Sequence, residues 1–409
     1  MSHSIRCLSV ALMLVLVSRP SINPAFSSSL TSTGPSDQAV QKTLLSRYMD
    51  LLIEKGICDE RGREIDDRIG GLIQASREKG IREDGKILNF ILAELNYSAS
   101  NLGNFPACAF DRPIGHKLGW FGRTASPGNI DADAEGSACP AGGIGSGAYE
   151  WTMSGNFRYW FLKSGWVVDD TVWANQFHVY MKQGKKAIAQ TLSADAPPSS
   201  ILKAWEWRYP AGQGSYYALY PKSGFSYERN DDFPVELAVT QFSPVIPHNY
   251  RETSFPVAVY KWIAENQSGR QADFSIMLTW QNMIGWEPIQ RPGRGDFAWD
   301  RKSSGITNVF VEQGLKKGIV FTRKNIDLKR GNALTGSMCI AAAEVPGKAA
   351  VFFHADFDPT KDGNEIWTSF STNGTLSNSA ASRTASAEET LAGAIAVKLN
   401  LKPGERVEF

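Results

Sequence analysis

Apolar residues recur at intervals of three and four positions in the N-terminal quarter of the chain. The pattern falls in three stretches between residues 39 and 97, on Val40, Leu44, Leu45, Tyr48, Leu51 and Leu52, then on Ile65, Ile69, Leu72 and Ile73, and then on Ile87, Leu88, Ile91, Leu92 and Leu95. This spacing predicts three amphipathic helices, the first of which begins after an N-cap at Ser36 or Asp37. We expect residues 39–104 to form a helical appendage that acts as a packing collar or as a docking site for a partner.

The pattern changes at about residue 105, where Gly, Pro and aromatic residues become frequent and short apolar runs replace the helical spacing. The runs that read as strands are Trp205–Tyr209, Tyr216–Tyr220, Val235–Phe242, Val257–Ala264, Ala272–Trp280, Asn308–Glu312, Ile319–Arg323, Ser337–Glu344, Ala349–Phe353 and Ala394–Leu401. Within the fifth run, Phe274, Ile276, Leu278 and Trp280 alternate with other positions, which predicts one buried face. Many short strands separated by turn residues favour a mainly β sandwich over an alternating βαβ sheet.

The first residues have the layout of a secretory signal peptide. Arg6 precedes the apolar run Leu8–Val17, and small residues follow at Ala25–Ser29. The run is too short to span a bilayer, and no other stretch of the chain is long and apolar enough. We therefore expect residues 1–27 to be a signal peptide, residues 28–38 a flexible leader, and the mature protein to be secreted or periplasmic without a membrane span.

Charge and composition narrow the classes of partner. The chain has 43 Lys plus Arg against 42 Asp plus Glu, and no long basic stripe of the kind that binds nucleic acid. Its 12 Trp residues are suited either to filling a large β core or to stacking on carbohydrate. We expect most of them in the core, with exposed ones such as Trp120, Trp166, Trp173 or Trp286 as candidates for a sugar-binding surface.

Four cysteines remain when the signal peptide is removed with Cys7: Cys58, Cys108, Cys139 and Cys339. An exported protein can form disulfides, and four cysteines allow three pairings, among which the sequence does not decide. Their spacing matches no zinc motif, and the whole chain has 5 His, so we expect no structural zinc site.

The glycine run Gly142-Gly143-Ile144-Gly145-Ser146-Gly147 has some likeness to a phosphate-binding loop. In the Rossmann fingerprint the third glycine comes one residue later, and a Walker loop ends in Gly-Lys-Ser/Thr. Residues 148–153, which follow the run, resemble a strand rather than an apolar helix. We interpret the run as a tight backbone turn that uses the freedom of glycine in φ.

Two acidic stretches are candidates for calcium. Residues 131–136 begin like a calcium loop, but the twelfth position, which should be a bidentate Glu, is Gly142. We interpret this stretch as a solvated acidic loop. Residues 356–365 also offer several oxygen ligands, and calcium binding there is a second, weaker hypothesis.

Adjacent carboxylates occur at Asp66-Asp67, Asp169-Asp170 and Asp231-Asp232. Sugar hydrolysis needs two carboxylates that flank one bond, whereas neighbours along a strand point to opposite faces. Charged turns explain all three pairs. The segment Gly145-Ser146-Gly147 lacks the full context of a serine nucleophile. We therefore assign no catalytic, cofactor-binding or metal-binding residue, and expect no cofactor.

Several segments together resemble glycoside hydrolase family 116, the bile-acid β-glucosidase or non-lysosomal glucosylceramidase family. They are the glycine run with Phe157-Arg158-Tyr159-Trp160, the segment Asn175–Val179, the Ser-Pro-x-x-Pro-His block within Gln241–Tyr250 and its continuation Ser254–Val259, the segment Phe274–Trp286, Ile366-Trp367 with Phe370, Gly374 and Leu376, and Leu401–Glu405. The resemblance covers residues 105–409, and the Ser-Pro-x-x-Pro-His block is its most specific part. Residues 39–97 lie outside it.

The resemblance implies a large two-sheet antiparallel β-sandwich, which in this family precedes a helical (α/α) barrel that carries the nucleophile and the acid/base of a retaining β-glucosidase. No residue of the chain matches those catalytic positions. We therefore expect a non-catalytic N-terminal domain whose partner is a separate family 116 barrel and whose last strand ends near Phe409. The alternative is a stand-alone module that binds carbohydrate or has a structural role.

Overall fold

A computed structural model describes residues 74–81, 103, 105, 109–115, 138–230, 233–293, 296–301, 304–324, 333–387 and 389–409. The chain divides into two compact units, Met1–Asp111 and Arg112–Phe409. In the first unit residues 74–78 are helical. The expected signal peptide, the leader and the rest of the expected helices lie outside the described residues. None of the described helices is long and apolar enough to cross a membrane.

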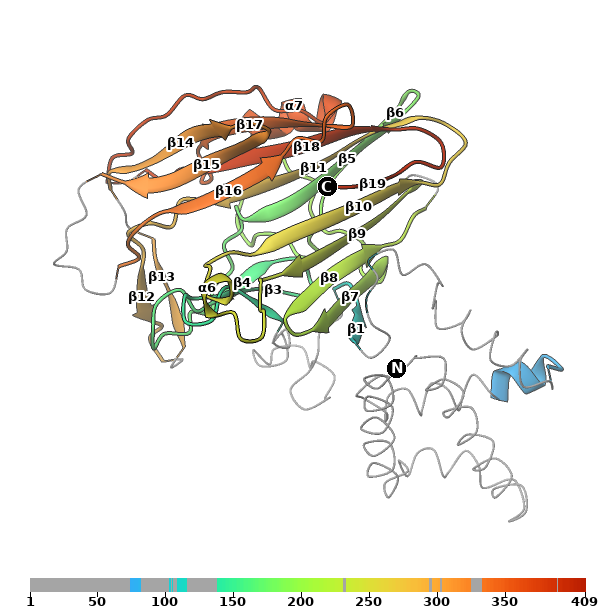
Figure 1. Cartoon of the computed structure of the whole chain (residues 1–409), viewed down its shortest axis with the longest axis horizontal. Coiled ribbons are helices and arrows are strands. Elements are labelled where there is room, and N and C mark those ends of the chain that lie inside the picture. The colour runs from blue at the N-terminus through green and yellow to red at the C-terminus, as the bar shows by residue number, and fades with distance from the viewer. Residues whose placement is uncertain are drawn as a thin grey trace, which may run out of the picture. The chain divides into compact units, whose positions relative to one another are not determined.

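The second unit is mainly β, and its strands form several antiparallel sheets (Figure 1). One sheet has the order β1 (Phe110–Pro113), β7 (Gly214–Leu219), β8 (Lys222–Tyr227), β9 (Val235–Phe242), β10 (Val259–Asn266) and β19 (Arg406–Glu408). Another has the order β17 (Ala349–Phe357), β18 (Ala392–Leu401), β11 (Ala272–Gln281), β5 (Gln176–Gln183) and β6 (Lys186–Thr191). The expectation of a β-rich, antiparallel fold is confirmed.

Three smaller sheets complete the unit, so the strands are not confined to a clearly defined pair of sheets. They are β2 (Pro140–Ala141), β3 (Tyr149–Trp151) and β4 (Phe157–Trp160); β12 (Glu287–Gln290) and β13 (Phe297–Asp300); and β14 (Ile306–Gln313), β15 (Lys316–Arg323) and β16 (Met338–Ala343). Val168 forms single bridges to both Trp160 and Phe297, which joins β4 to β13. The loop before β5 therefore acts as a connecting strand between two of the small sheets.

An aromatic core lies where β3 and β4 meet the two large sheets. Trp151 is fully buried, and its ring lies 5.0 Å from Phe177 on β5, 4.4 Å from Phe225 on β8 and 5.6 Å from Tyr260 on β10. Phe177 in turn lies 5.1 Å from Trp262. Large aromatic side chains from three sheets thus fill one interior, where each buried ring contributes about 1.5–3 kcal/mol by leaving water.

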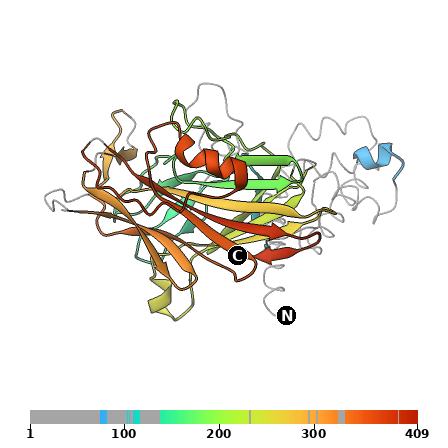
Figure 2. The same cartoon turned by 90° about the horizontal axis from the view of Figure 1, so that it is seen from above.

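The helix α7 (Asn364–Asn373) covers the outer face of the five-stranded sheet (Figure 2). It buries Ile366, Trp367 and Phe370, and its core cluster includes Met277 of β11. The expectation that β11 has a single buried face is therefore wrong, because α7 covers one face and the aromatic core the other. The hydrophobic pattern of the sequence predicted neither α7 nor the burial of the second face of β11.

Candidate docking surface

The glycine run is the turn between β2 and β3. A Cβ atom on Gly142 would collide with the carbonyl oxygen of Gly147, and one on Gly143 would collide with the carbonyl oxygen of Phe255. Only glycine allows the backbone to approach so closely. A strand, β3, follows the run. The interpretation of the run as a tight turn rather than a phosphate loop is confirmed.

Hydrogen bonds attach this turn to the segment that contains the Ser-Pro-x-x-Pro-His block. The Gly142 N–H donates to Ser243 Oγ at 2.7 Å, and the Ser243 hydroxyl donates to the Val257 carbonyl oxygen at 2.9 Å. The Ile144 N–H donates to the Thr253 carbonyl oxygen at 2.9 Å. Two motifs that are far apart in the sequence therefore form one structural unit.

The attached segment is ordered by its own polar side chains. It contains the single-turn helix α6 (Tyr250–Thr253), which is capped by Asn249 through a 3.3 Å hydrogen bond from the Glu252 N–H. Thr253 Oγ1 both accepts from the Ile246 N–H and donates to the Ile246 carbonyl oxygen, each at 3.0 Å. A helix this short is unstable alone, so these bonds and the glycine turn hold it in place.

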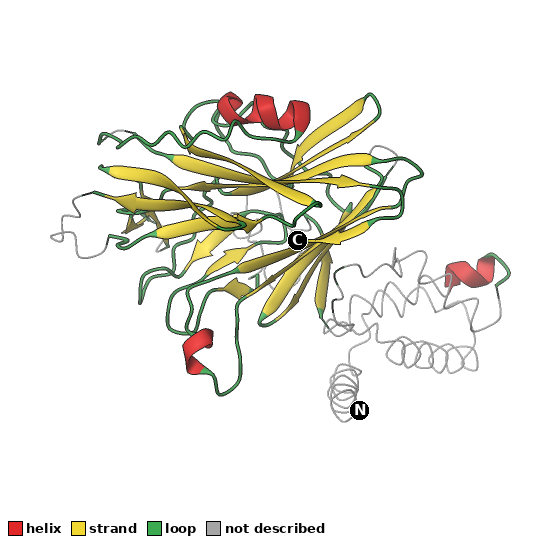
Figure 3. Cartoon of the chain, turned by 45° about the horizontal axis from the view of Figure 1, so that its top comes forward, coloured by secondary structure: helices red, strands yellow, loops and turns green. Residues whose placement is uncertain are grey.

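Six exposed apolar side chains lie on these two bonded segments, and we call them the apolar ridge: Ile144, Ile246, Tyr250, Phe255, Val257 and Val259. The Tyr250 side chain is the most open, at 82% exposure, and α6 stands out from the strands (Figure 3). Single exposed apolar residues are ordinary, but a set gathered on two bonded segments is typical of an interaction surface. The ridge was not among the predicted sites. The signal for it in the sequence is the mixture of Pro with large apolar residues in a stretch too irregular for a strand.

Buried polar groups hold the segment at β2 that leads into the glycine run. Glu150 on β3 is only 5% exposed and its carboxylate accepts a 2.8 Å hydrogen bond from the Ala138 N–H. The Cys139 N–H donates to the Tyr216 hydroxyl at 3.0 Å, and Gln241 Nε2 donates to the Cys139 carbonyl oxygen at 3.4 Å. These contacts tie the chain entering the glycine run to β3 and to the six-stranded sheet.

Burial raises the pKa values of two side chains in this cluster. It raises the pKa of Glu150 to about 7, although the hydrogen bond from Ala138 opposes the rise. Burial also raises the pKa of the Cys139 thiol to about 11, with a smaller contribution from the charge of Glu150. A buried carboxyl that titrates near neutrality was not anticipated from the sequence, where Glu150 stands unmarked between two aromatic residues.

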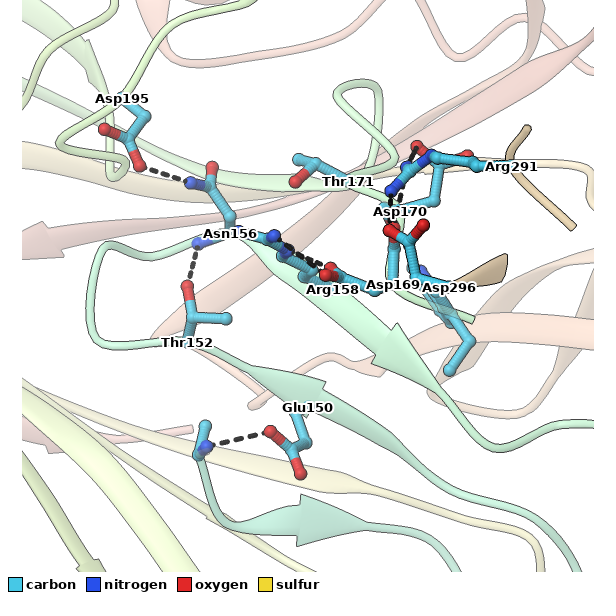
Figure 4. Close-up of polar contacts among 12 residues, drawn as sticks. Glu150, Thr152, Asn156, Arg158, Asp169, Asp170, Thr171, Asp195, Arg291 and Asp296 are labelled. Atoms are coloured by element: carbon cyan, nitrogen blue, oxygen red, sulfur yellow. Dashed lines mark hydrogen bonds and ion pairs between the residues drawn. The ribbon is translucent and has the colours of Figure 1, made fainter. Parts of the chain in front are cut away.

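A second polar cluster lies beside β4 and involves Asp169 and Asp170 (Figure 4). Asp169 forms an ion pair with Arg158. Asp170 instead pairs with Arg301 at 3.0 Å, and Arg291 lies 3.8 Å from it. The Asp169 side chain therefore attaches the 168–172 segment to β4, and the Asp170 side chain attaches it to the β12–β13 hairpin. This segment is extended rather than a turn, so the interpretation of the pair as a charged turn is wrong in its local geometry, although both carboxylates are held in ion pairs. Asp66-Asp67 and Asp231-Asp232 lie outside the described residues.

The acidic stretch at residues 356–365 uses its oxygens within the protein. Asp356 pairs with Arg383 at 3.3 Å, Asp358 Oδ1 accepts from the Thr360 N–H at 2.9 Å, and Glu365 lies 3.3 Å from His354. Among the described residues, no three His, Cys, Asp or Glu side chains are grouped so that they could hold a metal ion. Residues 131–136 lie outside the described part of the chain.

The tryptophans and cysteines singled out in the sequence have different environments. Trp286 is fully buried, and Trp166 lies against Phe297, with ring centroids 4.7 Å apart. Trp173 is half-buried, and Trp120 lies outside the described residues. Within the described part of the chain Cys139 and Cys339 are free thiols and are not joined to each other. Cys58 and Cys108 are not among the described residues.

The fold and these sites define a β-rich domain that presents an apolar ridge. The adjacent carboxylates described above form ion pairs within the protein. Residues 138–409 match the family described as beta-glucosidase 2, glycosyl-hydrolase family 116 N-term. The match covers most of the chain and includes the glycine run and the Ser-Pro-x-x-Pro-His block. The chain belongs to this family, as the N-terminal domain of a β-glucosidase family.

Proposed function

We propose that residues 138–409 form a non-catalytic supporting domain, which packs a family 116 catalytic barrel against the apolar ridge. The single observation that carries this proposal is that hydrogen bonds join the glycine run to the segment of the Ser-Pro-x-x-Pro-His block, and that both segments bear exposed apolar side chains. The assembled pair would perform retaining hydrolysis of a β-glucoside, with its catalytic carboxylates on the barrel.

The polar contacts of the domain favour a structural role over a catalytic one. Retaining glycosidases hold two carboxyl groups about 5–5.5 Å apart around the bond that breaks. Asp169 and Asp170 are each paired with an arginine, and Glu150 is buried and bonded to a backbone N–H. Each of these three carboxylates is engaged by a partner within the protein, which is the arrangement expected of a structural group.

A chromogenic β-glucoside tests the non-catalytic part of the proposal. The purified chain alone should release no chromophore above the rate of buffer, at any pH between 4 and 8. Turnover that persists through repeated purification and is lost in Glu150→Gln or Asp169→Asn would overturn the proposal, because it would place the chemistry in this domain.

Substitutions on the ridge test the docking part. Phe255→Ser should reduce co-purification with a co-expressed family 116 barrel domain, because it removes an apolar contact that the partner would cover. Val311→Ser on β14 is a matched control, since its side chain has nearly the same exposure, 42% against 43% for Phe255. Equal capture of the barrel by both variants would refute the ridge as the docking surface.

We also propose that the six- and five-stranded sheets act as the two facing layers of a sandwich. The ring contacts between Phe177 on β5 and both Tyr260 and Trp262 on β10 support this arrangement. In a double-mutant cycle, Phe177→Ala and Trp262→Ala should show a coupling of about 0.5–1.5 kcal/mol in the free energy of unfolding. Strictly additive effects would count against facing layers.

Export through the signal peptide at residues 1–27 remains a proposal for the localisation. A culture-medium or periplasmic fraction should contain a chain that begins near residue 28. Recovery of a full-length chain that starts at Met1 from the cell interior alone would contradict it.

A further inference from the structure

A turn with a strained backbone lies within the apolar ridge. Residues 246–249 form this turn, which is closed by a 3.1 Å hydrogen bond from the Asn249 N–H to the Ile246 carbonyl oxygen. Pro247 at its second position fixes a negative φ, whereas His248 at its third position has a φ of 65°. This combination is that of a type II turn, whose third position favours glycine because a side chain there crowds the backbone. A histidine therefore stands where the turn itself favours glycine.

Hydrogen bonds from α6 hold both ends of this turn. Thr253 Oγ1 bonds both the N–H and the carbonyl oxygen of Ile246, the first residue of the turn. Asn249, the last residue, accepts from the Glu252 N–H as the N-cap of α6. A strained conformation persists only where the surrounding structure imposes it. These bonds therefore keep the backbone of His248 in the left-handed region, and the imidazole is positioned before any partner arrives, which lowers the entropy lost on binding.

Local contacts account for three of the other described non-glycine residues that have a positive φ. Leu202 is fully buried in the core. The Arg158 guanidinium lies 4.9 Å over the ring of Tyr159, and the Asn378 side chain accepts a 3.1 Å hydrogen bond from a backbone N–H of β17. The side chain of His248 is exposed, and no hydrogen bond, ion pair or ring contact joins it to the described residues. Contacts within the described chain therefore do not explain why this position carries an imidazole.

We propose that His248 is the recognition residue of the apolar ridge, and that its imidazole donates a hydrogen bond to an acceptor oxygen of the docked barrel domain. His248 stands between two ridge residues, Ile246 and Tyr250, which are 45% and 82% exposed. A partner that covers them also removes water from the imidazole, and an acceptor buried there without a donor would cost free energy. One such polar contact among apolar ones gives an interface its selectivity. This inference rests on the proposed function and names the polar contact within it.

Substitution of His248 by glycine separates strain from recognition, and urea unfolding of the full chain measures the strain. His248→Gly should raise the folding equilibrium constant about threefold, because relief of the strained φ outweighs the greater freedom of glycine in the unfolded chain. Arg208→Gly is the matched control, since Arg208 is also exposed, also has a φ of 65° and is not part of the ridge. Both variants should therefore be more stable than the wild-type chain.

Isothermal titration calorimetry with a family 116 barrel domain measures recognition, and here the two variants should differ. His248→Gly should bind the barrel about tenfold more weakly than the wild-type chain, which corresponds to about 1.4 kcal/mol. Arg208→Gly should bind it with unchanged affinity. His248→Asn should recover part of the loss, because asparagine keeps an N–H donor and is better tolerated at a positive φ.

Equal affinity of the barrel for the wild-type chain and His248→Gly would overturn this inference and leave the proposed function standing. An equal loss of affinity in Arg208→Gly would also overturn it, because the effect would not be specific to the ridge. Unchanged stability of His248→Gly would contradict the strain from which the inference starts. A barrel that binds neither the wild-type chain nor any variant would refute the proposed function, and this inference with it, so the two claims fail through different results.

Discussion

Glu150→Gln should remove a pH dependence from the stability of the domain. The pKa of Glu150 is raised from its ordinary value of 4.5 to about 7 in the folded chain, because burial disfavours the carboxylate. The folded state therefore holds the proton more tightly than the unfolded state does. This group contributes stability that is fully present below about pH 4.5 and is lost as the pH rises to about 7.

The size of the effect follows from the shift. Each pKa unit corresponds to about 1.36 kcal/mol, so a rise from 4.5 to about 7 sets an upper bound of about 3.4 kcal/mol. Partial access of water to the carboxyl reduces this, and we expect a decline of about 1–2 kcal/mol in the free energy of unfolding between pH 4.5 and 7. Glutamine keeps an oxygen that can accept the Ala138 N–H, so the substitution removes the titration with little other change.

Urea unfolding of the wild-type chain and Glu150→Gln at half-unit pH steps measures this difference. The two curves should diverge between pH 4.5 and 7, with the wild-type chain losing stability relative to the variant. His178, whose pKa is lowered to about 3 by burial, acts in the opposite direction but is present in both chains. Glu206→Gln, on an exposed glutamate, controls for the loss of a charge. Parallel curves for wild type and Glu150→Gln would refute the assignment of a buried, titrating carboxyl.

Three further substitutions probe the account. Gly143→Ala should lower the free energy of unfolding by about 1–3 kcal/mol in urea titrations, because its Cβ meets the Phe255 backbone; a neutral effect would contradict the close packing of the glycine turn on the ridge. Asp170→Asn should cost about 1–3 kcal/mol and speed proteolytic cleavage near the β12–β13 hairpin, since Arg301 loses its carboxylate partner and keeps only its hydrogen bond to the Thr171 carbonyl oxygen; an unchanged cleavage rate would count against that role. Met277→Ala should lower the free energy of unfolding by about 2–5 kcal/mol in thermal unfolding, whereas Ile289→Ala, at an exposed position, should lower it by less than about 0.5 kcal/mol. Equally small losses in both variants would argue against α7 covering β11.

The strand pattern of the sequence anticipated much of the fold. The run Val235–Phe242 is β9 with the predicted ends, and Ala272–Trp280 differs from β11 by one residue. These strands combine apolar, β-branched or aromatic residues with bounding turns, so local chemistry is sufficient to find them. The run Trp205–Tyr209, which was predicted as a strand, is not one. Leu202 and Trp205 form hydrogen bonds to the loop at residues 361–363, and the run does not pair with a neighbouring strand along its length.

The sites depended on contacts that sequence spacing does not reveal. The glycine run was correctly interpreted as a turn, because glycine density and the strand after it are local signals. Its attachment to Ser243 joins residues a hundred positions apart, and only the fold brings them together. The raised pKa of Glu150 arises from burial, which depends on the packed fold and not on the residues adjacent to Glu150 in the sequence.

The central claim, that this domain supports a catalytic barrel through the apolar ridge, is tested most directly by the thermal stability of a family 116 barrel domain. The melting temperature of the barrel should rise when the wild-type chain is added, and should rise equally with Val311→Ser, because Val311 lies on β14, in a sheet that contains none of the ridge residues. Addition of the double variant Tyr250→Ser, Phe255→Ser should leave it unchanged. A barrel that melts at the same temperature with and without the wild-type chain, or that is stabilised equally by the ridge variant, would contradict the account.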